Sequence, residues 1–472
     1  MNFKKTLQFS LGPIGSAIIG LITIPIMTWF ISSESIGRLS LIQTLTSLCL
    51  LTCSLGLDQV YVREYHESTD KNSLFKNVLI PSVTLFLILF FLSFFLYESI
   101  GLYLVGVSSL QVYLLIGTAL LAAILNRFFS LILRLEERGI AYSLSQLMPK
   151  VVFLSLFIVV VVFYEHREFY SLFLIHIMSL VCISLVLFWN IRKNIPFILN
   201  SHLDFKKIKE YFKFGFPLVL GGIAFWGLTG MDKVLLSKLS SLNELGLYAI
   251  TVNFAAVGLI LQSIFSTIWA PLLYIWVSDG VDIDKIENVT DIMLFIVVFI
   301  FSLSGLFSWL VSFFLPDYYN QVQYLFILCL AFPLFYTLSE TTAVGIGVTR
   351  KTIFSMLISI VIAIINFLGN YLLIPSYGAL GAAISTAISF WLFFILRTEF
   401  SYRLWLTMPR LKIYFFSFIC LMLAIVEGLF GNTFIFELKV AWLLLFVLNV
   451  FCARNKIIKY WEIWRQSRKK TV

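Results

Sequence analysis

The chain has 472 residues, of which 60% are hydrophobic and only 12% are charged. Soluble domains are about 45–50% apolar and about 25% charged, so most of this chain cannot face water. The net charge of +9 does not indicate a nucleic-acid partner, because the basic residues fall in short segments between long apolar runs. The composition therefore predicts an all-α integral membrane protein.

Fourteen apolar runs are long enough to cross the roughly 30 Å hydrocarbon core of a bilayer as helices of about 20 residues. In chain order we expect these spans at 8–31, 39–62, 78–97, 110–133, 147–164, 169–191, 212–236, 245–275, 292–315, 322–348, 352–374, 378–397, 411–429 and 434–453. The run at 245–275 is longer than one crossing needs, so we expect it to tilt or to extend into the interface.

The basic residues predict the orientation of these spans. With the N-terminus in the cytoplasm, all but five of the 34 Lys and Arg residues belong to the inner side. Short inner loops of membrane proteins are enriched in Lys and Arg, so we expect both ends of the chain in the cytoplasm. The inner loop at 276–291 fits less well, because Lys285 is its only basic residue.

Two polar segments are typical of basic helices on the inner leaflet. The segment 192–211 carries five basic residues, and Phe205, Ile208 and Phe212 follow at helical spacing. The tail at 454–472 also has an apolar face among basic residues. We therefore expect membrane lipids as partners of both segments, although a solvated orientation signal explains them equally well.

The two halves of the chain share a weak repeat. Pro13 and Pro217 lie near the starts of the first and seventh spans, and turns that end in Gly37 and Gly246 follow these spans. Repeats and Pro- or Gly-broken helices at matching positions are common in transporters.

Motifs for catalysis are missing from the sequence. It has no G-x-x-x-x-G-K-[ST] loop for ATP, no dinucleotide fingerprint and no metal pattern around its four histidines. Asp282 and Asp284 have the spacing of a metal-binding Asp-x-Asp pair, but two acids in a short polar loop are common, and no extramembrane segment is long enough to fold alone. We therefore expect a conduit without a cofactor, and not an enzyme.

Three stretches carry a family resemblance. They are Phe30–Gly37 with Ser54–Arg63, Phe214–Pro217 with Met231–Lys233 and Leu245–Tyr248, and Asn366–Asn370 with Ile374–Ala383. In order and spacing they resemble the polysaccharide-exporter branch of the multidrug/oligosaccharidyl-lipid/polysaccharide (MOP) transporter superfamily. Ile36 departs from the pattern, because the family usually has an aromatic residue there.

The resemblance implies two six-helix lobes that form a V, followed by two further helices at the C-terminus. The expected divisions are a lobe at 1–191, a linker at 192–211, a lobe at 212–397, two extra helices at 398–453 and a tail at 454–472. It also implies a central cavity lined by the first, second, seventh and eighth spans.

The function implied by the resemblance is that of a flippase in the bacterial cytoplasmic membrane. Its cargo would be an undecaprenyl-diphosphate-linked oligosaccharide, an O-antigen or capsule repeat unit, moved by alternating access. The drive would be a gradient of H⁺ or Na⁺, and other polysaccharide-assembly proteins would be partners. A drug/cation antiporter and a lipid-precursor flippase of the same superfamily remain alternatives. A membrane polysaccharide polymerase is a further alternative, against which the short outer loops argue.

Deep charges are the candidate site residues. A charge inside a membrane costs about 2.5–3.5 kcal/mol on insertion scales and usually faces a bundle interior or a cavity. Glu340 precedes Arg350, which we expect at the inner surface, by ten residues. At 1.5 Å per residue Glu340 is about 15 Å deep, so we predict that it binds the coupling proton or cation.

Four further charges complete the predicted cavity. They are Asp232 and Lys233 toward the outer end of the seventh span, and Arg63 and Arg127 toward the inner ends of the second and fourth. Arg and Lys are suited to the negative diphosphate of the cargo. In the alternative, structural interpretation, Arg63 and Arg127 extend to the inner surface, and the other two pair with neighbouring helices.

Overall fold

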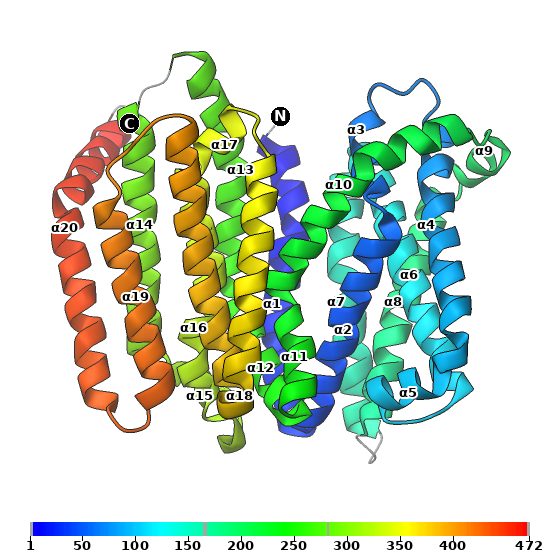
Figure 1. Ribbon diagram of the computed structural model, residues 1–472, viewed down its shortest axis with the longest axis horizontal. Coiled ribbons are helices and arrows are strands. Elements are labelled where there is room, and N and C mark those ends of the chain that lie inside the picture. The colour runs from blue at the N-terminus through cyan, green and yellow to red at the C-terminus, as the bar shows by residue number, and fades with distance from the viewer. Residues whose placement is uncertain (1–2, 164–167, 281–282, 470–472) are drawn as a thin grey trace. The chain divides into compact units, whose positions relative to one another are not determined.

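The computed structural model describes residues 3–163, 168–280 and 283–469, and in these ranges the chain is helical with no β-strand (Figure 1). The chain forms two compact units, Met1–Asn253 and Phe254–Val472. Asp282 of the predicted Asp-x-Asp pair lies outside the described residues, as do the side chains of the basic tail from residue 455 onward.

Twenty α-helices and two short 3₁₀ helices make up the described chain. In the first unit they are α1 (Phe3–Phe30), α2 (Ser33–Ser54), α3 (Leu57–Glu64), α4 (Lys71–Ser93), η1 (Phe94–Leu96), α5 (Tyr97–Val105), α6 (Leu110–Leu135), α7 (Gly139–Phe163), α8 (Phe169–Ile191), α9 (Ile195–Asn200), α10 (Phe205–Thr229), α11 (Met231–Leu239) and α12 (Leu242–Ala255). The second unit contains α13 (Val257–Ser278), α14 (Ile283–Phe307), α15 (Trp309–Phe313), η2 (Asp317–Tyr319), α16 (Val322–Thr342), α17 (Val344–Val348), α18 (Ile353–Leu404), α19 (Leu411–Phe430) and α20 (Ile435–Lys469).

The longest helix, α18, is a hairpin of two spans. Its 52 residues would extend about 78 Å as a straight rod, far beyond the roughly 30 Å of hydrocarbon. The backbone bends at Gly378, where φ is 53° and ψ is −128°. Across the bend, Ser385 Oγ donates to the Asn366 carbonyl at 3.1 Å, and Gly381 packs against the Leu373 carbonyl, so the two arms run antiparallel.

This hairpin explains the number of spans. Thirteen helical stretches among the described residues are long and apolar enough to cross a membrane, and α18 counts as one of them. Dividing α18 at Gly378 yields fourteen, so the predicted all-α fold with about fourteen spans is confirmed.

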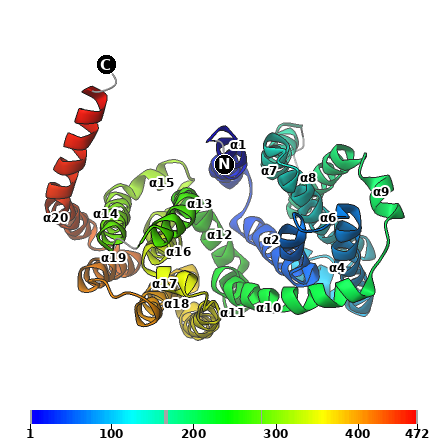
Figure 2. The ribbon, with the colours of Figure 1, turned by 90° about the horizontal axis from the view of Figure 1, so that it is seen from above.

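Each unit packs around one central helix. In the first unit, α6 contacts α2, α3, α4, α5, α7 and α8. In the second, α16 contacts α13, α14, α18 and α19, which surround it when the ribbon is seen from above (Figure 2). These two helices are the most buried of the described spans, and they correspond to the fourth and tenth predicted spans.

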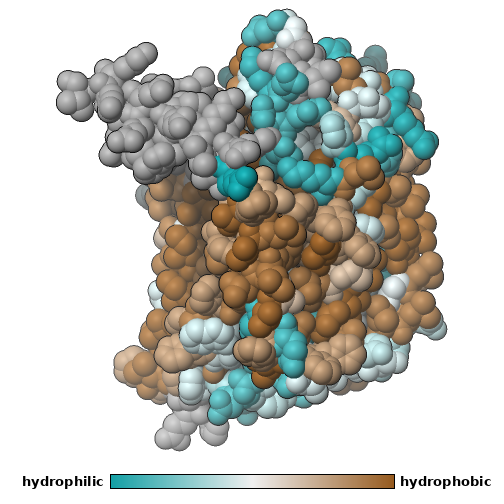
Figure 3. All heavy atoms as spheres, turned by 90° about the vertical axis from the view of Figure 1, so that its left-hand side faces the viewer, coloured by the Kyte–Doolittle hydropathy of each residue, from teal (hydrophilic) through white to brown (hydrophobic). Residues whose placement is uncertain are grey.

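Apolar side chains cover the outside of the long helices. Phe91 of α4 is 69% exposed, Leu372 of α18 is 71% exposed and Phe436 of α20 is 77% exposed. Figure 3 shows a broad hydrophobic belt on the side of the molecule where α20 lies, with hydrophilic residues above and below it. Soluble proteins rarely expose such continuous apolar surface, so these helices are in contact with lipid in a multi-pass membrane protein.

The basic segment 192–211 differs from the single helix that we expected. It divides into the short helix α9 and the first turns of α10, which continues into the membrane. Asp204 begins α10, because its carboxylate accepts the backbone N–H groups of Lys206 at 2.9 Å and Lys207 at 3.2 Å. The wider division into lobes at 1–191 and 212–397 remains a prediction.

The two turns of the proposed repeat meet in the first unit. Gly37 in the first turn of α2 lies against the backbone of Leu242, and Gly246 in α12 lies against the backbone of Ser33. Ser33 Oγ also donates to the Asn243 carbonyl at 2.7 Å. A Cβ atom on Gly246 would be only 1.9 Å from the Ser33 carbonyl oxygen, so a larger residue would separate the two helices.

We expect Gly246→Ala to lower the stability of the protein by about 1–3 kcal/mol or more, because the methyl group must push α2 away from α12. The measurement is the melting temperature of the detergent-purified protein. Gly20→Ala is the matched control, since its Cβ would meet only the far end of the Lys150 side chain, at 3.1 Å, and no backbone. Equal melting temperatures for the two variants would contradict this account of the turn contact.

Candidate functional site

Asp232 joins α11 to α12. Its side chain is only 2% exposed, and its carboxylate accepts a hydrogen bond from the Tyr248 hydroxyl and another, at 2.7 Å, from the backbone N–H of Lys233. A buried carboxylate needs such donors, because burial without them costs several kcal/mol. The second resemblance stretch thus folds so that its Asp and its Tyr bind each other.

Lys233 faces a small polar cavity beside this contact. The cavity has a volume of about 170 Å³, and its lining includes Gln43, Ser47, Trp226 and Lys233. Trp226 Nε1 donates to Ser47 Oγ at 3.0 Å, which fixes one wall. The space is large enough for several water molecules, each of which occupies about 30 Å³ in the liquid.

Arg127 and Arg63 have different surroundings. Arg127 forms an ion pair with Asp58, with 2.7 Å between Nη2 and Oδ2 and 3.1 Å between Nε and Oδ2. Asp58 is 7% exposed, so the guanidinium of Arg127 neutralises a buried charge. Arg63 lies on the next turn of α3, but its side chain is exposed, with the guanidinium 4.3 Å from the ring centre of Phe214.

Glu340 lines a cavity of about 220 Å³ in the second unit. Its Oε2 accepts a hydrogen bond of 2.6 Å from Ser266 Oγ, and Trp269 Nε1 donates to its backbone carbonyl at 3.0 Å. Arg397 lines the same cavity and donates from Nη1 to Ser339 Oγ at 2.7 Å. The Nε of Arg397 is buried with no hydrogen-bond partner among the described residues. This cavity is therefore lined by both a carboxylate and a guanidinium.

Sequence reasoning missed Arg397 and Lys150. Arg397 is the last residue of the predicted span 378–397, so we counted it among the basic residues of the inner side. In the structure α18 continues to Leu404. Lys150 was counted in the same way, because we expected its span to begin at residue 147. The helix α7 begins at Gly139, so Lys150 lies about 16 Å along it.

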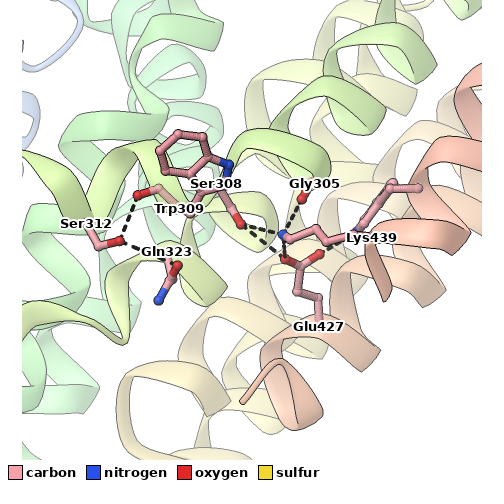
Figure 4. Close-up of polar contacts among 8 residues, drawn as sticks. Gly305, Ser308, Trp309, Ser312, Gln323, Glu427 and Lys439 are labelled. Atoms are coloured by element: carbon pink, nitrogen blue, oxygen red, sulfur yellow. Dashed lines mark hydrogen bonds and ion pairs between the residues drawn. The ribbon is translucent and has the colours of Figure 1, made fainter. Parts of the chain in front are cut away.

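A further ion pair lies buried in the second unit (Figure 4). Glu427 is 1% exposed, and its Oε1 is 2.9 Å from Lys439 Nζ. Lys439 also donates to Ser308 Oγ at 2.8 Å and to the Gly305 carbonyl, while Trp442 Nε1 donates to Glu427. These bonds connect α19 and α20 to the end of α14, and they leave little room for a ligand. We assign this cluster a structural role.

Among the described residues, no three His, Cys, Asp or Glu side chains come together as a metal site. Of the five predicted residues, Asp232 and Lys233 are neighbours in sequence and contact each other through the Lys233 backbone N–H, and Glu340 lies in the second unit. Arg127 instead pairs with Asp58, and Arg63 is exposed beside Phe214. The arrangement offers binding groups in cavities and ion pairs between helices.

Solved structures share this fold. The chain aligns with a lipid II flippase MurJ in its inward closed conformation, with a TM-score of 0.64 at 16% identity, over 96% of this chain and 100% of that one. An inward-facing multidrug resistance MATE family transporter of the MOP superfamily aligns with a TM-score of 0.54 at 14% identity, over 85% and 95% of the two chains. The protein therefore has the fold of MOP superfamily transporters.

The family follows from the sequence. Residues 3–274 match the model of the family described as polysaccharide biosynthesis protein, and the chain belongs to that family. The capsular polysaccharide biosynthesis protein CapF of Staphylococcus aureus is 25% identical over 248 residues, which is 50% of this chain and 60% of CapF. The resemblance read from the three sequence stretches is confirmed.

We expect Lys439→Met to destabilise the protein by about 3–5 kcal/mol, because Glu427 would keep a buried charge without its partner. The double variant Lys439→Met with Glu427→Gln should recover most of the loss. Lys412→Met is the matched control: it breaks the exposed ion pair with Asp291, whose expected contribution is below about 1 kcal/mol. Melting temperature and membrane abundance are the measurements. Equal losses of stability in the two single variants would contradict the expectation that the buried pair contributes more than the exposed one.

Proposed function

We propose that this protein moves a lipid-linked oligosaccharide across the bacterial cytoplasmic membrane by alternating access. The cargo is an undecaprenyl-diphosphate-linked repeat unit of O-antigen or capsule. The observation that carries the proposal is the match of residues 3–274 to the polysaccharide biosynthesis family. The fold supports it, because a lipid II flippase and a multidrug transporter have the same fold. The protein is a transporter in this proposal and not an enzyme.

The charges that face cavities support this cargo. Lys233 presents an ammonium group to a polar cavity in the first unit, and ammonium groups bind phosphate well. We propose that it contacts the diphosphate of the cargo. Asp232 and Arg127 support the helices around it, because each has a buried partner in Tyr248 or Asp58. Arg63 is exposed enough to contact the cargo at the edge of its path.

Glu340 is our candidate for the coupling-ion site. A carboxylate in a cavity between spanning helices can bind H⁺ or Na⁺, and the hydroxyl of Ser266 beside it is a further oxygen ligand. Transport driven by such a gradient needs no ATP hydrolysis, which agrees with the lack of a nucleotide motif in the sequence. Other polysaccharide-assembly proteins would supply and receive the cargo.

The alternatives differ in what accumulates when the gene is deleted. Loss of the proposed flippase leaves lipid-linked repeat units on the cytoplasmic side of the membrane. Loss of a polymerase leaves single units on the outer side, and loss of a drug/cation antiporter changes neither pool. Accumulation of a cell-wall precursor would instead identify a lipid-precursor flippase.

In the deletion strain, we expect Glu340→Gln to lose most of the surface polysaccharide, by about tenfold or more, at normal membrane abundance. The amide keeps the size of the side chain but cannot bind a proton or cation as the carboxylate does. Lys233→Met should cause a similar loss. Glu34→Gln is the control, since Glu34 forms an exposed pair with Arg38 on the same helix. Wild-type amounts of surface polysaccharide in both Glu340→Gln and Lys233→Met would contradict the proposed roles of these residues.

The proposed orientation puts both ends of the chain in the cytoplasm. We expect single cysteines at Glu34, Ser241 and Asn432, all exposed positions, to react with a membrane-impermeant thiol reagent in intact cells. A cysteine at His202, also exposed, should react only after the cells are opened. The background is a variant without the six native cysteines. Labelling of position 202 in intact cells would contradict the proposed topology.

A further inference from the structure

The Glu340 carboxyl group lies at the end of a short chain of polar contacts in the second unit. Ser266 Oγ is 2.6 Å from Glu340 Oε2 and 2.8 Å from the backbone carbonyl oxygen of Gln262, one turn earlier on α13. A hydroxyl group carries a single hydrogen, so Ser266 cannot donate a full hydrogen bond to both oxygens. If Glu340 is ionised, its carboxylate and the Gln262 carbonyl therefore compete for that hydrogen.

A proton on Glu340 removes this competition. The carboxylic acid then donates to Ser266 Oγ, and the Ser266 hydroxyl donates to the Gln262 carbonyl, so that each contact has its own hydrogen. A sodium ion brings no hydrogen and leaves the two oxygens in competition. The distances around Ser266 thus fit a protonated Glu340 better than one that has bound a metal cation.

Arg397 brings a permanent positive charge to the same cavity. Its Nη1 donates to Ser339 Oγ at 2.7 Å, and its guanidinium lies 5.2 Å from the ring centre of Phe393. These contacts hold the guanidinium beside the residue that precedes Glu340. An opposite charge nearby favours the ionised form of a carboxyl group. Glu340 can therefore release a proton within the membrane without a metal ion to balance its charge.

The rest of the cavity offers little to a metal cation. Among the described residues that line it, Glu340 is the only carboxylate, and Arg397 of α18 and Tyr274 of α13 are the other titratable groups. The remaining side-chain oxygens of this lining belong to neutral hydroxyl groups, and α14, α15 and α19, which also pack against α16, contribute none of it. Hard metal cations prefer several oxygen ligands, usually with more than one carboxylate, and a resident guanidinium repels them.

We propose that Glu340 binds a proton and not a sodium ion, and that Arg397 is the residue that determines this choice. The bound proton makes Glu340 a carboxylic acid that donates to Ser266, and it is exchanged with water. After its release, the charge of Arg397 balances the carboxylate. The inference rests on the proposed role of Glu340 as the coupling-ion site, and it names the ion.

The test is infrared spectroscopy of the purified full-length protein in lipid vesicles during a pH titration. A protonated carboxylic acid has a C=O stretching band that an ionised carboxylate lacks. We expect the wild type to show such a band and to lose it as the pH rises, and Glu340→Gln to lack it. Replacement of K⁺ by Na⁺ in the buffer should leave the midpoint of the loss unchanged. A midpoint at lower pH in Na⁺, or no band from Glu340 at any pH, overturns the proposal.

Variants of Arg397 test its part in the choice. Arg397→Gln removes the balancing charge, so the proton affinity of Glu340 should rise by about tenfold or more, whereas Arg397→Lys should titrate like the wild type. Lys412→Met is the control, because it removes a cation from the exposed pair with Asp291. An unchanged midpoint in Arg397→Gln overturns the role of Arg397. If that variant does not fold, the comparison of Na⁺ with K⁺ in the wild type decides between the two ions.

Ser266→Ala tests the contact that indicates the proton. The carboxylic acid would lose its acceptor, so its C=O band should move to the frequency of a more weakly hydrogen-bonded acid, and an unchanged frequency overturns this contact. The band is measured without transport, so the two proposals can fail separately. A proton on Glu340 together with wild-type polysaccharide in Glu340→Gln would support the proton site and contradict its role in coupling.

Discussion

The hydrocarbon interior of a membrane contains no water that could solvate a polar group, and the whole structure depends on this constraint. Helices satisfy the backbone, because each N–H reaches a carbonyl of the same segment. Side-chain charges need partners of their own, and the chain provides them: Arg127 binds Asp58, Lys439 binds Glu427, and Tyr248 donates to Asp232. Each of these contacts connects different helices, so charge neutralisation also determines which helices are neighbours.

The same constraint separates the deep charges into two groups. Asp58, Asp232 and Glu427 are buried with charged or hydroxyl partners, and a ligand could reach them only by breaking those contacts. Lys150, Lys233 and Glu340 instead line cavities. A charge at such a position costs stability that a neutral residue would avoid, which is why these three residues are candidates for a functional site.

Hydropathy predicted the spans well because crossing a bilayer requires about 20 apolar residues, whatever their neighbours. It even divided α18 into its two arms, although the turn at Gly378 contains no polar loop. The start of α7 was missed because Ser143, Ser145 and Gln146 read as a loop. In the structure Ser143 donates to the Gln8 carbonyl of α1 and Ser145 donates to its own helix, so polar residues are accommodated within a span. Because of the same error, Lys150 was counted with the inner loop and was not considered as a deep charge.

The resemblance stretches contribute mainly to the architecture. Gly37 and Gly246 bring two helix starts into backbone contact, and a Cβ on Gly56 would lie 2.4 Å from the Gly215 carbonyl oxygen. These positions admit only glycine at such separations, for reasons independent of any ligand. Of the charged residues that line cavities, Glu340, Arg397 and Lys150 lie outside those stretches, whereas Lys233 lies within one. Proteins with the same motifs and fold can therefore differ in the side chains that line their cavities.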